Sequence, residues 1–276
     1  MQFIREKLRH PLVVRRLRVG AVHDVVPSIR RVTLTGEELA GFTSLGPGDH
    51  LKVFLPDPAT GVLSTPIVTP DGALQRPDDA VVIQRDFTPR EYRPAGNGRA
   101  ELDVDFVLHG DAGPASAWAS RAQVGDELAI GGPKGSKLPP PGIDRLILVA
   151  DETALPSATR WIRLVGDDVA VTALLGVADA TVEDYFEDDV AARADIEWLP
   201  RTDGPGLVED ALRSLGPIGE RTYVAMAGEA GSLVPLRRYL RRELGLPADQ
   251  VAATGYWRQG VVNLDHHAPI DPTDPD

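Results

Sequence analysis

Three side chains just after an apolar run have the types needed to hold a flat, phosphorylated molecule. Arg85, Phe87 and Thr88 follow residues 80–83, whose sequence AVVI is typical of a strand. An arginine offers a fork for a phosphate, a phenylalanine a flat surface for a ring, and a threonine a short hydrogen-bonding group. Thr88 precedes Pro89, which favours an extended backbone. The set suits a flavin nucleotide, and the alternative is an ordinary exposed strand end before a turn.

A second segment with phosphate-binding character is HGDAGPASAWAS, residues 109–120, which is expected to end a strand and open a short helix. Its GPAS stretch would present backbone amides at the start of that helix, which suits a pyrophosphate. The small side chains of Ala115 and Ser116 allow close approach. The alternative is a turn in which Ser116 is an ordinary helix cap. The phosphate interpretation gains from the first segment, because both could meet around one ligand.

The first half of the chain must position both segments, and its pattern is one of short strands separated by Gly- and Pro-containing turns. This pattern indicates an antiparallel barrel or sandwich, with a long loop over residues 57–79. The expected strands cover residues 16–26, 30–35, 50–55, 81–87, 102–109 and 127–130.

The pattern changes at KLPPPGID, residues 137–144, and predicts two domains, 1–140 and 141–276. Beyond the boundary, helical stretches separate apolar runs, which is typical of a doubly wound parallel sheet. Ligands of such sheets bind beyond the carboxyl ends of the strands, and no G-x-G-x-x-G motif occurs there. The expected strands cover residues 146–150, 169–177, 195–199, 223–227 and 251–256, and the last helix covers 232–244.

The composition of the 276 residues excludes several classes of function. A formal net charge of −12 argues against general nucleic-acid binding, and the acidic runs, including the C-terminal tail, are expected to face solvent. No run approaches the ~20 apolar residues of a membrane span, and no signal peptide is evident. The absence of cysteine fits a cytoplasmic protein and excludes thiolate chemistry. His266 and His267 lack further tail ligands with metal-site spacing. The oligomeric state has no signal in the sequence.

Five segments in order give the chain a specific resemblance. RDFTPREY, LDVDFVLHGDAGPASAWA, GDELAIGGPKGS, DETALP and GYWRQG span nearly its whole length. In these motifs the chain resembles the siderophore-interacting protein family, which comprises ferric-siderophore reductases related to ferredoxin–NADP reductases. The resemblance implies a flavin-binding antiparallel β-barrel followed by a nicotinamide-binding α/β domain, in agreement with the two halves described above.

The resemblance implies FAD as the cofactor. Arg85 would contact phosphate, Phe87 would pack against the flavin nucleotide, and Thr88 would hydrogen-bond near the flavin ring. Phe87 stands where the family commonly has tyrosine, so a phenol hydrogen bond is missing. The further FAD contacts that the resemblance implies are Val107 and His109 along the flavin, and Ala115 and Ser116 at the phosphate.

The same resemblance implies a nicotinamide site at Asp151 and Thr153, although that loop lacks the glycines of the broader reductase group. It also places basic side chains beside the flavin to receive an anionic ferric siderophore. Lys52 and Arg258 match such positions; the alternatives are an ordinary edge-strand lysine and an arginine that covers Trp257. No lysine follows Arg258, and the tail is acidic, which argues against a highly anionic siderophore.

The sequence therefore predicts an FAD-dependent ferric-siderophore reductase with no catalytic side chain of its own. Electron transfer to iron needs no side-chain base, so His109 is expected to be a neutral core or cofactor-contacting imidazole and not a general base. Two alternatives are a general flavin or ferric reductase and a non-catalytic iron-chelate carrier of the same fold. NADH is expected over NADPH, because Asp179, Asp184 and Glu229 would repel a 2′-phosphate. The basic residues further along the last helix are Arg237, Arg238, Arg241 and Arg242.

Overall fold

The computed structural model describes residues 2–70, 74–78, 80–96, 98–110, 113–178, 180–203, 206–265 and 268–274. The chain divides into two compact units. Lys7–Leu138 form the barrel unit, and Pro139–Asp276 together with Met1–Glu6 form the sheet unit. None of the helices in the described ranges has both the length and the apolar character of a membrane span.

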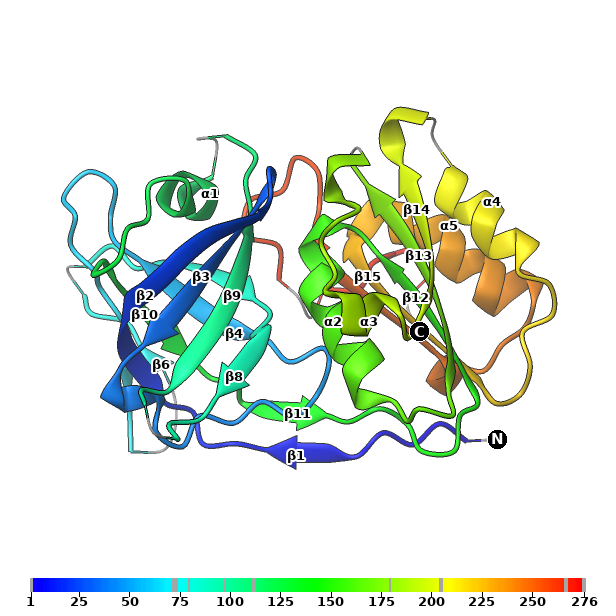
Figure 1. Ribbon diagram of the computed structural model, residues 1–276, viewed down its shortest axis with the longest axis horizontal. Helices are drawn as coiled ribbons and strands as arrows, with labels where there is room; N and C mark the ends of the chain where they lie inside the picture. The colour runs from blue at the N-terminus through cyan, green and yellow to red at the C-terminus, as the bar shows by residue number, and fades with distance from the viewer. Residues whose placement is uncertain are drawn as a thin grey trace. The chain divides into compact units, whose positions relative to one another are not determined.

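The barrel unit is built on an antiparallel sheet of seven strands in the order β7-β4-β10-β2-β3-β9-β8 (Figure 1). Its strands are β2 Val14–Val26, β3 Ile29–Thr35, β4 Leu51–Leu55, β7 Ile83–Phe87, β8 Glu91–Arg93, β9 Glu101–Val107 and β10 Glu127–Gly131. Two short pairs, β1 Lys7–Arg9 with β11 Gly135–Lys137 and β5 Ile67–Val68 with β6 Leu74–Gln75, the helix α1 Pro114–Ala119 and the 3₁₀ helix η1 Glu37–Leu39 complete the described elements. The predicted antiparallel barrel is confirmed.

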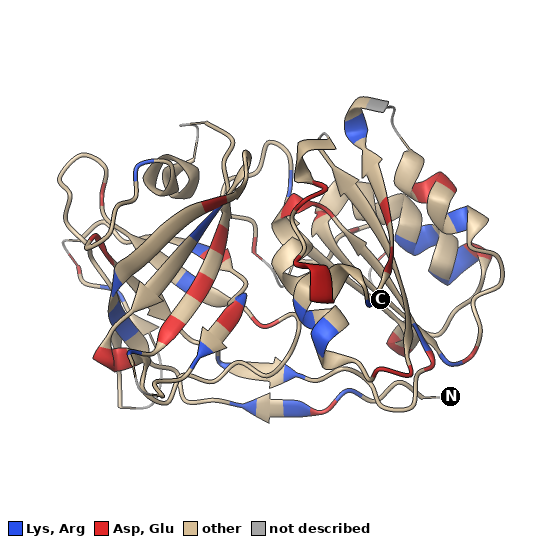
Figure 2. Ribbon diagram, in the orientation of Figure 1, with Lys and Arg blue, Asp and Glu red and all other residues tan. Residues whose placement is uncertain are grey.

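Apolar and acidic side chains alternate along β9, so one face of this strand is turned to the barrel core. Leu102, Val104 and Phe106 are at most 1% exposed and belong to the apolar cluster inside the barrel. Asp103 and Asp105 point to the opposite face, because successive strand residues alternate. Figure 2 shows that acidic residues recur along β9.

The acidic face of β9 is matched by arginines from the neighbouring strands. Arg31 on β3 donates to Asp105 at 2.7 and 2.8 Å, and Arg93 on β8 donates to Asp103 at 2.7 and 2.9 Å. The side chain of Arg90, fully buried, lies 3.6 Å from Asp105. Buried charges are costly unless they are paired, so this network fixes how β3, β9 and β8 align.

The sheet unit contains five parallel strands in the order β14-β13-β12-β15-β16. They are β12 Arg145–Ala150, β13 Ala170–Val177, β14 Asp195–Pro200, β15 Thr222–Glu229 and β16 Val251–Trp257. The helices α2 Leu155–Leu164 and α3 Asp188–Ala191 lie on one face, and α4 Leu207–Ser214 and α5 Ala230–Arg238 lie on the other (Figure 1). The predicted doubly wound parallel sheet is confirmed.

The last helix differs from its prediction as a single element over 232–244. α5 begins two residues earlier and contains Pro235, and it passes at Tyr239 into a π-helical turn, Tyr239–Glu243. Leu233, Leu236 and Leu240 are buried on one stripe of this helix, but Leu244, which the sequence pattern also places on that stripe, is 41% exposed. The spacing of the apolar residues was therefore sufficient to predict the helix but not its change from α-helix to π-helix.

The expectation that the acidic tail faces solvent is wrong for Asp271 and Asp274. Arg238 donates to Asp271 at 2.6 Å, and Asp274 pairs with Arg237 at 3.2 Å and also with Arg242. The tail is therefore paired with three of the arginines on α5 and its extension, Arg237, Arg238 and Arg242, and Figure 2 shows basic residues along this helix. Opposite charges far apart in the sequence satisfy each other here, which composition alone does not reveal.

Candidate functional site

Two segments predicted to meet around one ligand are joined in the barrel unit by a row of aromatic rings. The ring centroids of Phe87 and Phe106 are 4.4 Å apart, and those of Phe106 and Trp118 are 5.6 Å apart. Phe87 ends β7, Phe106 lies on β9, and Trp118 lies on α1. The half-buried Phe87 keeps part of its ring accessible beside this row.

Arg85, two residues before Phe87 on the same strand, is a half-buried cation. Its Nη1 donates to the carbonyl of Gln84 at 2.7 Å, and no carboxylate pairs with it among the contacts of the described residues. Burial lowers the pKa of the Arg85 guanidinium. Arg31 and Arg93, by contrast, each hold a carboxylate with two hydrogen bonds. A partly desolvated guanidinium without an acidic partner fits the phosphate of a nucleotide cofactor.

The hydroxyl of Ser116 on α1 is hydrogen-bonded to the backbone of the residues that follow β9. Ser116 Oγ accepts from the backbone N–H of His109 at 2.9 Å and donates to the carbonyl of Gly110 at 2.8 Å. Ser116 is buried, so its single hydroxyl proton is committed to the loop. A Cβ on Gly113 would lie 3.1 Å from Cε1 of the exposed His109, so the imidazole packs closely over this glycine.

Three further predicted residues of the barrel unit, Thr88, Val107 and Ala115, are short or apolar and lie at or next to the ends of the elements that carry the aromatic row. Thr88 is buried at the end of β7, and Val107 is half-buried at the end of β9, opposite Ile29. Ala115, in the first turn of α1, packs against the barrel core. The nearby Arg90 backbone N–H donates to Asp103 O at 2.9 Å, which fixes the turn that follows Thr88.

Lys52 has an acidic partner on the adjacent strand. Its Nζ lies 2.8 Å from Asp86 Oδ1, and the two residues are register partners on β4 and β7. The side chains are 28% and 25% exposed. Asp86 therefore partly neutralises the positive charge that Lys52 presents to an approaching anion.

Asp151 directly follows β12 and lies at the carboxyl edge of the parallel sheet, where several residues donate hydrogen bonds to its carboxylate. Its Oδ1 accepts from Thr153 N at 2.9 Å and from Thr153 Oγ1 at 2.5 Å. Its Oδ2 accepts from Glu229 N at 2.8 Å and from Trp257 Nε1 at 2.8 Å. Burial raises the pKa of the Asp151 carboxyl, and the donors from Thr153, Trp257 and Glu229 oppose that shift. Asp151 thus joins the ends of β12, β15 and β16, and its oxygens are engaged within the protein.

Gly228 shows how closely the strands approach at Asp151. Its φ is +147°, and a Cβ there would lie 2.7 Å from the Asp151 carboxylate. Glycine at this position is needed both for the conformation and for the space. At the same carboxylate, Trp257 donates its indole N–H to Asp151 while 38% of the residue remains exposed at the end of β16.

Arg201 and Glu152 are edge residues that the sequence interpretation missed. Arg201 directly follows β14, and its Nη2 donates to Glu152 Oε1 at 2.7 Å. Its Nη1 donates to the carbonyl of Gly176 at 2.6 Å, and the backbone N–H of Ala178 also donates to Glu152. The signal was present, because Arg201 comes two residues after the strand predicted over 195–199, in a fold class that binds ligands at the carboxyl edge of its sheet.

The remaining sheet-unit predictions concern residues around β16 and the tail. Arg258 Nη2 donates to the Ile270 carbonyl at 2.5 Å, so this arginine holds the tail. The carboxylate of Glu229 accepts from Ser232 N at 2.6 Å and from Gln259 N at 3.2 Å. Asp184 is exposed. Asp179, His266 and His267 lie outside the described residues.

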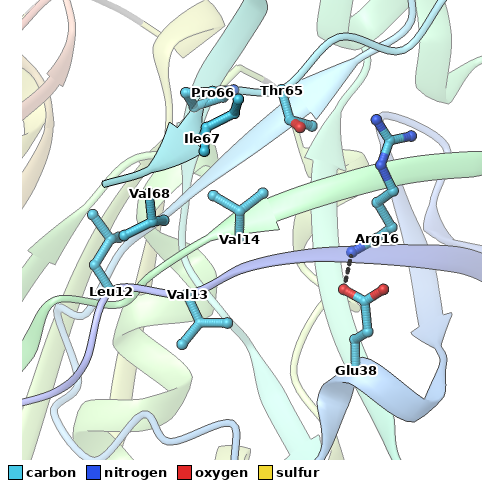
Figure 3. Close-up of a pocket in the computed structure, with 9 residues that line it drawn as sticks. All are labelled: Leu12, Val13, Val14, Arg16, Glu38, Thr65, Pro66, Ile67 and Val68. Atoms are coloured by element: carbon cyan, nitrogen blue, oxygen red, sulfur yellow. Dashed lines mark hydrogen bonds between the residues drawn. The ribbon is translucent and has the colours of Figure 1, made fainter. Parts of the chain in front are cut away.

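A pocket of about 430 Å³ occurs elsewhere in the barrel unit, at the start of β2 and along β5 (Figure 3). It is mostly apolar, with the pair formed by Arg16 N and Glu38 at one end. None of the predicted site residues lines it. Its lining residues are Leu12, Val13, Val14, Arg16, Glu38, Thr65, Pro66, Ile67 and Val68.

Comparison with known proteins agrees with this division of the chain. Residues 18–137 match the family model of the siderophore-interacting FAD-binding domain, and residues 143–260 match that of the siderophore-interacting protein. The ferric vibriobactin reductase ViuB of Vibrio cholerae is 35% identical over 250 residues, covering 88% of this chain and 89% of that protein. The NADPH-dependent ferric-chelate reductase of Escherichia coli is 33% identical, covering 91% of this chain and 96% of that protein.

A solved structure gives the same result. The crystal structure of a siderophore utilization protein from T. fusca has a TM-score of 0.87 and 40% identity, covering 96% of this chain and 100% of that one. Both units of the present chain are thus matched in order by one known protein. The chain belongs to the siderophore-interacting protein family.

Proposed function

We propose that this protein is a ferric-siderophore reductase that uses FAD and a reduced nicotinamide to convert siderophore-bound Fe(III) to Fe(II). The observation that carries the proposal is Arg85, a half-buried guanidinium with no carboxylate among its described contacts, on the same strand as the accessible Phe87 ring. A charge in that setting calls for an anionic partner, and the adjacent ring suits a flat one. The names of the two reductases reported above support the same activity.

We assign the FAD contacts residue by residue. Arg85 binds phosphate, Phe87 packs against the nucleotide, and Thr88 hydrogen-bonds near the flavin ring. Because the Ser116 hydroxyl already bonds the backbone of His109 and Gly110, its contribution is to hold those two residues in place. The remaining residues assigned to the cofactor are Val107, His109 and Ala115.

The two domains take separate roles in this proposal. Residues 1–140 bind FAD, apart from the first six, which pack with the sheet unit, and residues 141–276 bind the nicotinamide. Asp151 and Thr153 act there by positioning the edge of the sheet, because the carboxylate already accepts from donors on three strand ends. Trp257 then offers a fixed aromatic surface at that edge.

When bound, FAD supplies hydride acceptance from NAD(P)H and one-electron donation to Fe(III). The chain's own residues bind and orient the reactants, and no side chain is assigned a proton transfer. Lys52 and Arg258 are proposed to bind the ferric siderophore. Lys52 is ion-paired with Asp86, and Arg258 is hydrogen-bonded to the Ile270 carbonyl in the tail. Fe(II) binds hard oxygen donors more weakly than Fe(III) does, so the reduced metal leaves. We place the reaction in the cytoplasm, where reduced nicotinamide is available.

The test uses the purified full chain. Bound FAD should give the two visible absorption bands of a flavin, and NAD(P)H should bleach them without oxygen. A ferric siderophore should then restore the bands and yield Fe(II) that a ferrous chelator captures. A colourless protein that binds the iron chelate would indicate a carrier. Restoration by simple ferric chelates but not by siderophores would indicate a general ferric reductase.

A further inference from the structure

The pocket beside β2 in the barrel unit has the size and the lining of a site for a small molecule. Its volume of about 430 Å³ lies within the range of roughly 300–1,000 Å³ that is usual for such sites. Sites of this kind are lined mainly by apolar side chains and carry a few polar groups that orient the ligand. The apolar lining here consists of Leu12, Val13, Val14, Pro66, Ile67 and Val68, and the polar lining of Arg16, Glu38 and Thr65.

The pocket lies on the outer face of β2 and not inside the barrel. Leu17 and Val19, on the same strand, belong to the apolar cluster inside the barrel. Successive strand residues point to opposite faces, so Val14 and Arg16 point outward. Residues 65–68, which include β5, line the other side of the pocket (Figure 3). A ligand can therefore enter between β2 and this segment without disturbing the barrel core.

Several apolar side chains of the pocket are exposed to solvent. Ile67 is 65% exposed and Val13 is 37% exposed, while Leu12, Val14 and Val68 are half-buried. Apolar side chains gathered around a hollow mark a binding site more often than apolar residues scattered singly on a surface. A ligand with an apolar body would remove this surface from water, which is favourable in proportion to the area covered.

Arg16 and Thr65 supply hydrogen-bond donors at the polar end of the pocket. Arg16 Nη2 lies 3.4 Å from the Leu63 carbonyl, and no carboxylate pairs with this guanidinium among the described residues. The hydroxyl of the half-buried Thr65 has no hydrogen-bond partner among those residues. Figure 3 shows the Arg16 guanidinium on the same side of β2 as Thr65. An arginine fork binds a carboxylate through two parallel hydrogen bonds, so this end of the pocket suits a carboxylate.

Glu38, the acidic residue of the lining, limits the charge that the ligand can carry. Its Oε2 accepts from the backbone N–H of Arg16 at 2.8 Å, and its carboxylate lies on the opposite side of β2 from the Arg16 guanidinium (Figure 3). The guanidinium therefore remains available to a ligand. The negative charge of Glu38 would repel a second negative charge on that ligand. A group with one negative charge thus suits this end better than a doubly charged phosphate.

We propose that this pocket binds a straight-chain monocarboxylate, with the carboxylate at Arg16 and Thr65 and the chain along Leu12, Val14 and Ile67. A cavity of about 150 Å³ holds a six-carbon ring, so about 430 Å³ corresponds to roughly 15 non-hydrogen atoms. Dodecanoate, a fatty acid of medium length, is of that size. None of the residues assigned to FAD, the nicotinamide or the siderophore lines the pocket, so this site goes beyond the proposed function.

The chain offers a matched control for each end of the pocket. Arg18 is exposed on the same outer face of β2, two residues after Arg16, but it pairs with Glu127 and does not line the pocket. Val124 is 70% exposed, close to the 65% of Ile67, and also lies outside the lining. Arg16→Ala is therefore compared with Arg18→Ala, and Ile67→Asp with Val124→Asp. Each pair makes the same change of charge at an exposed residue, so a general effect on the fold would appear in both members.

The first measurement is calorimetric titration of the purified full chain with dodecanoate, below its micelle concentration. Wild type, Arg18→Ala and Val124→Asp should bind it with the same affinity. Arg16→Ala should lose about tenfold, because a hydrogen bond between charged groups is removed. Ile67→Asp should lose at least about tenfold, because it sets a carboxylate against the apolar chain. Absence of binding by wild type, or equal affinity in wild type and both pocket variants, would overturn the proposal.

The second measurement varies the ligand while the flavin absorbance is followed. Dodecanol, which has the same chain without a charge, should bind about tenfold more weakly than dodecanoate, and Arg16→Ala should not weaken it further. Octanoate should bind more weakly by up to about fourfold for each methylene removed. Dodecyl phosphate should bind more weakly than dodecanoate because of Glu38. Affinity that ignores both the charge and the chain length, or release of FAD by dodecanoate, would contradict a separate monocarboxylate site in this pocket.

Discussion

Trp257 donates its indole N–H to Asp151 Oδ2 at 2.8 Å, so the last strand of the sheet unit is tied to the end of its central strand. The same carboxylate takes donors from Thr153 and Glu229. A buried charge with this many donors is stable only while all of them stay in place. The edge proposed to bind the nicotinamide is therefore organised by one side chain.

Asp151→Asn should destabilise the sheet unit and slow flavin reduction. The amide would turn an N–H₂ group toward one pair of donors, and an unsatisfied buried group costs about 1–3 kcal/mol. Trp257→Phe keeps an aromatic ring and removes one donor, so it should cost less. Thermal unfolding and stopped-flow reduction by NADPH measure the two effects. Wild-type stability and rate in Asp151→Asn would show that the carboxylate organises nothing.

Arg85→Ala should weaken FAD binding by about 1.5–3 kcal/mol, or about 10- to 150-fold, because a charge-assisted phosphate contact is lost. Arg18→Ala is the control, since Arg18 is exposed on β2 and paired with Glu127. Fluorescence titration of the apoprotein with FAD gives both dissociation constants. An unchanged constant in folded Arg85→Ala would remove this residue from the site.

Lys52 and its partner should have opposite effects on an anionic ferric siderophore. Lys52→Ala removes the positive charge beside Asp86 and should raise the KM. Asp86→Asn frees the lysine charge and should lower the KM and steepen its dependence on ionic strength. Steady-state reduction at several salt concentrations tests the pair. Two variants that shift the KM in the same direction would exclude a steering role for this ion pair.

The tail should detach from α5 in acid. Hydrogen bonds from Thr273, together with the pairing with Arg238, lower the pKa of Asp271 to about 2. A folded-state pKa below the ordinary value of about 3.9 means that this carboxylate stabilises the fold fully above about pH 4. That contribution is lost as the pH falls from about 4 to about 2. Urea unfolding of wild type and Asp271→Asn should differ at pH 6 and converge near pH 2; a constant difference would contradict the coupling.

Elements whose signal is local were predicted well from the sequence. The alternation in β9 and the unbroken apolar run of β12 each fix a strand within about one or two residues. α4, the helix Leu207–Ser214, was missed because the segment before it has no clear cap, and the π-helical turn after α5 leaves the apolar stripe unchanged.

The candidate site was predicted in part, because its residue types are local but their partners are not. Arg85 and Phe87 lie in the same five-residue strand, so a site for a phosphate beside a flat ring could be predicted from that segment alone. Asp151 lies in a segment whose sequence is typical of a ligand-binding loop. Only the fold shows that its carboxylate accepts a hydrogen bond from Trp257, 106 positions later. Arg201 depends on Glu152 in the same way, through a sheet order that the sequence does not state.

The most direct test of the account is anaerobic reoxidation of the reduced protein. Purified protein would be reduced with one equivalent of NADPH and mixed with a ferric siderophore, while the flavin absorbance and the Fe(II)–chelator signal are followed together. The account predicts that the flavin bands return and that two Fe(II) form for each flavin reoxidised. Flavin that stays reduced with a siderophore panel, or that reoxidises without releasing Fe(II), would contradict it.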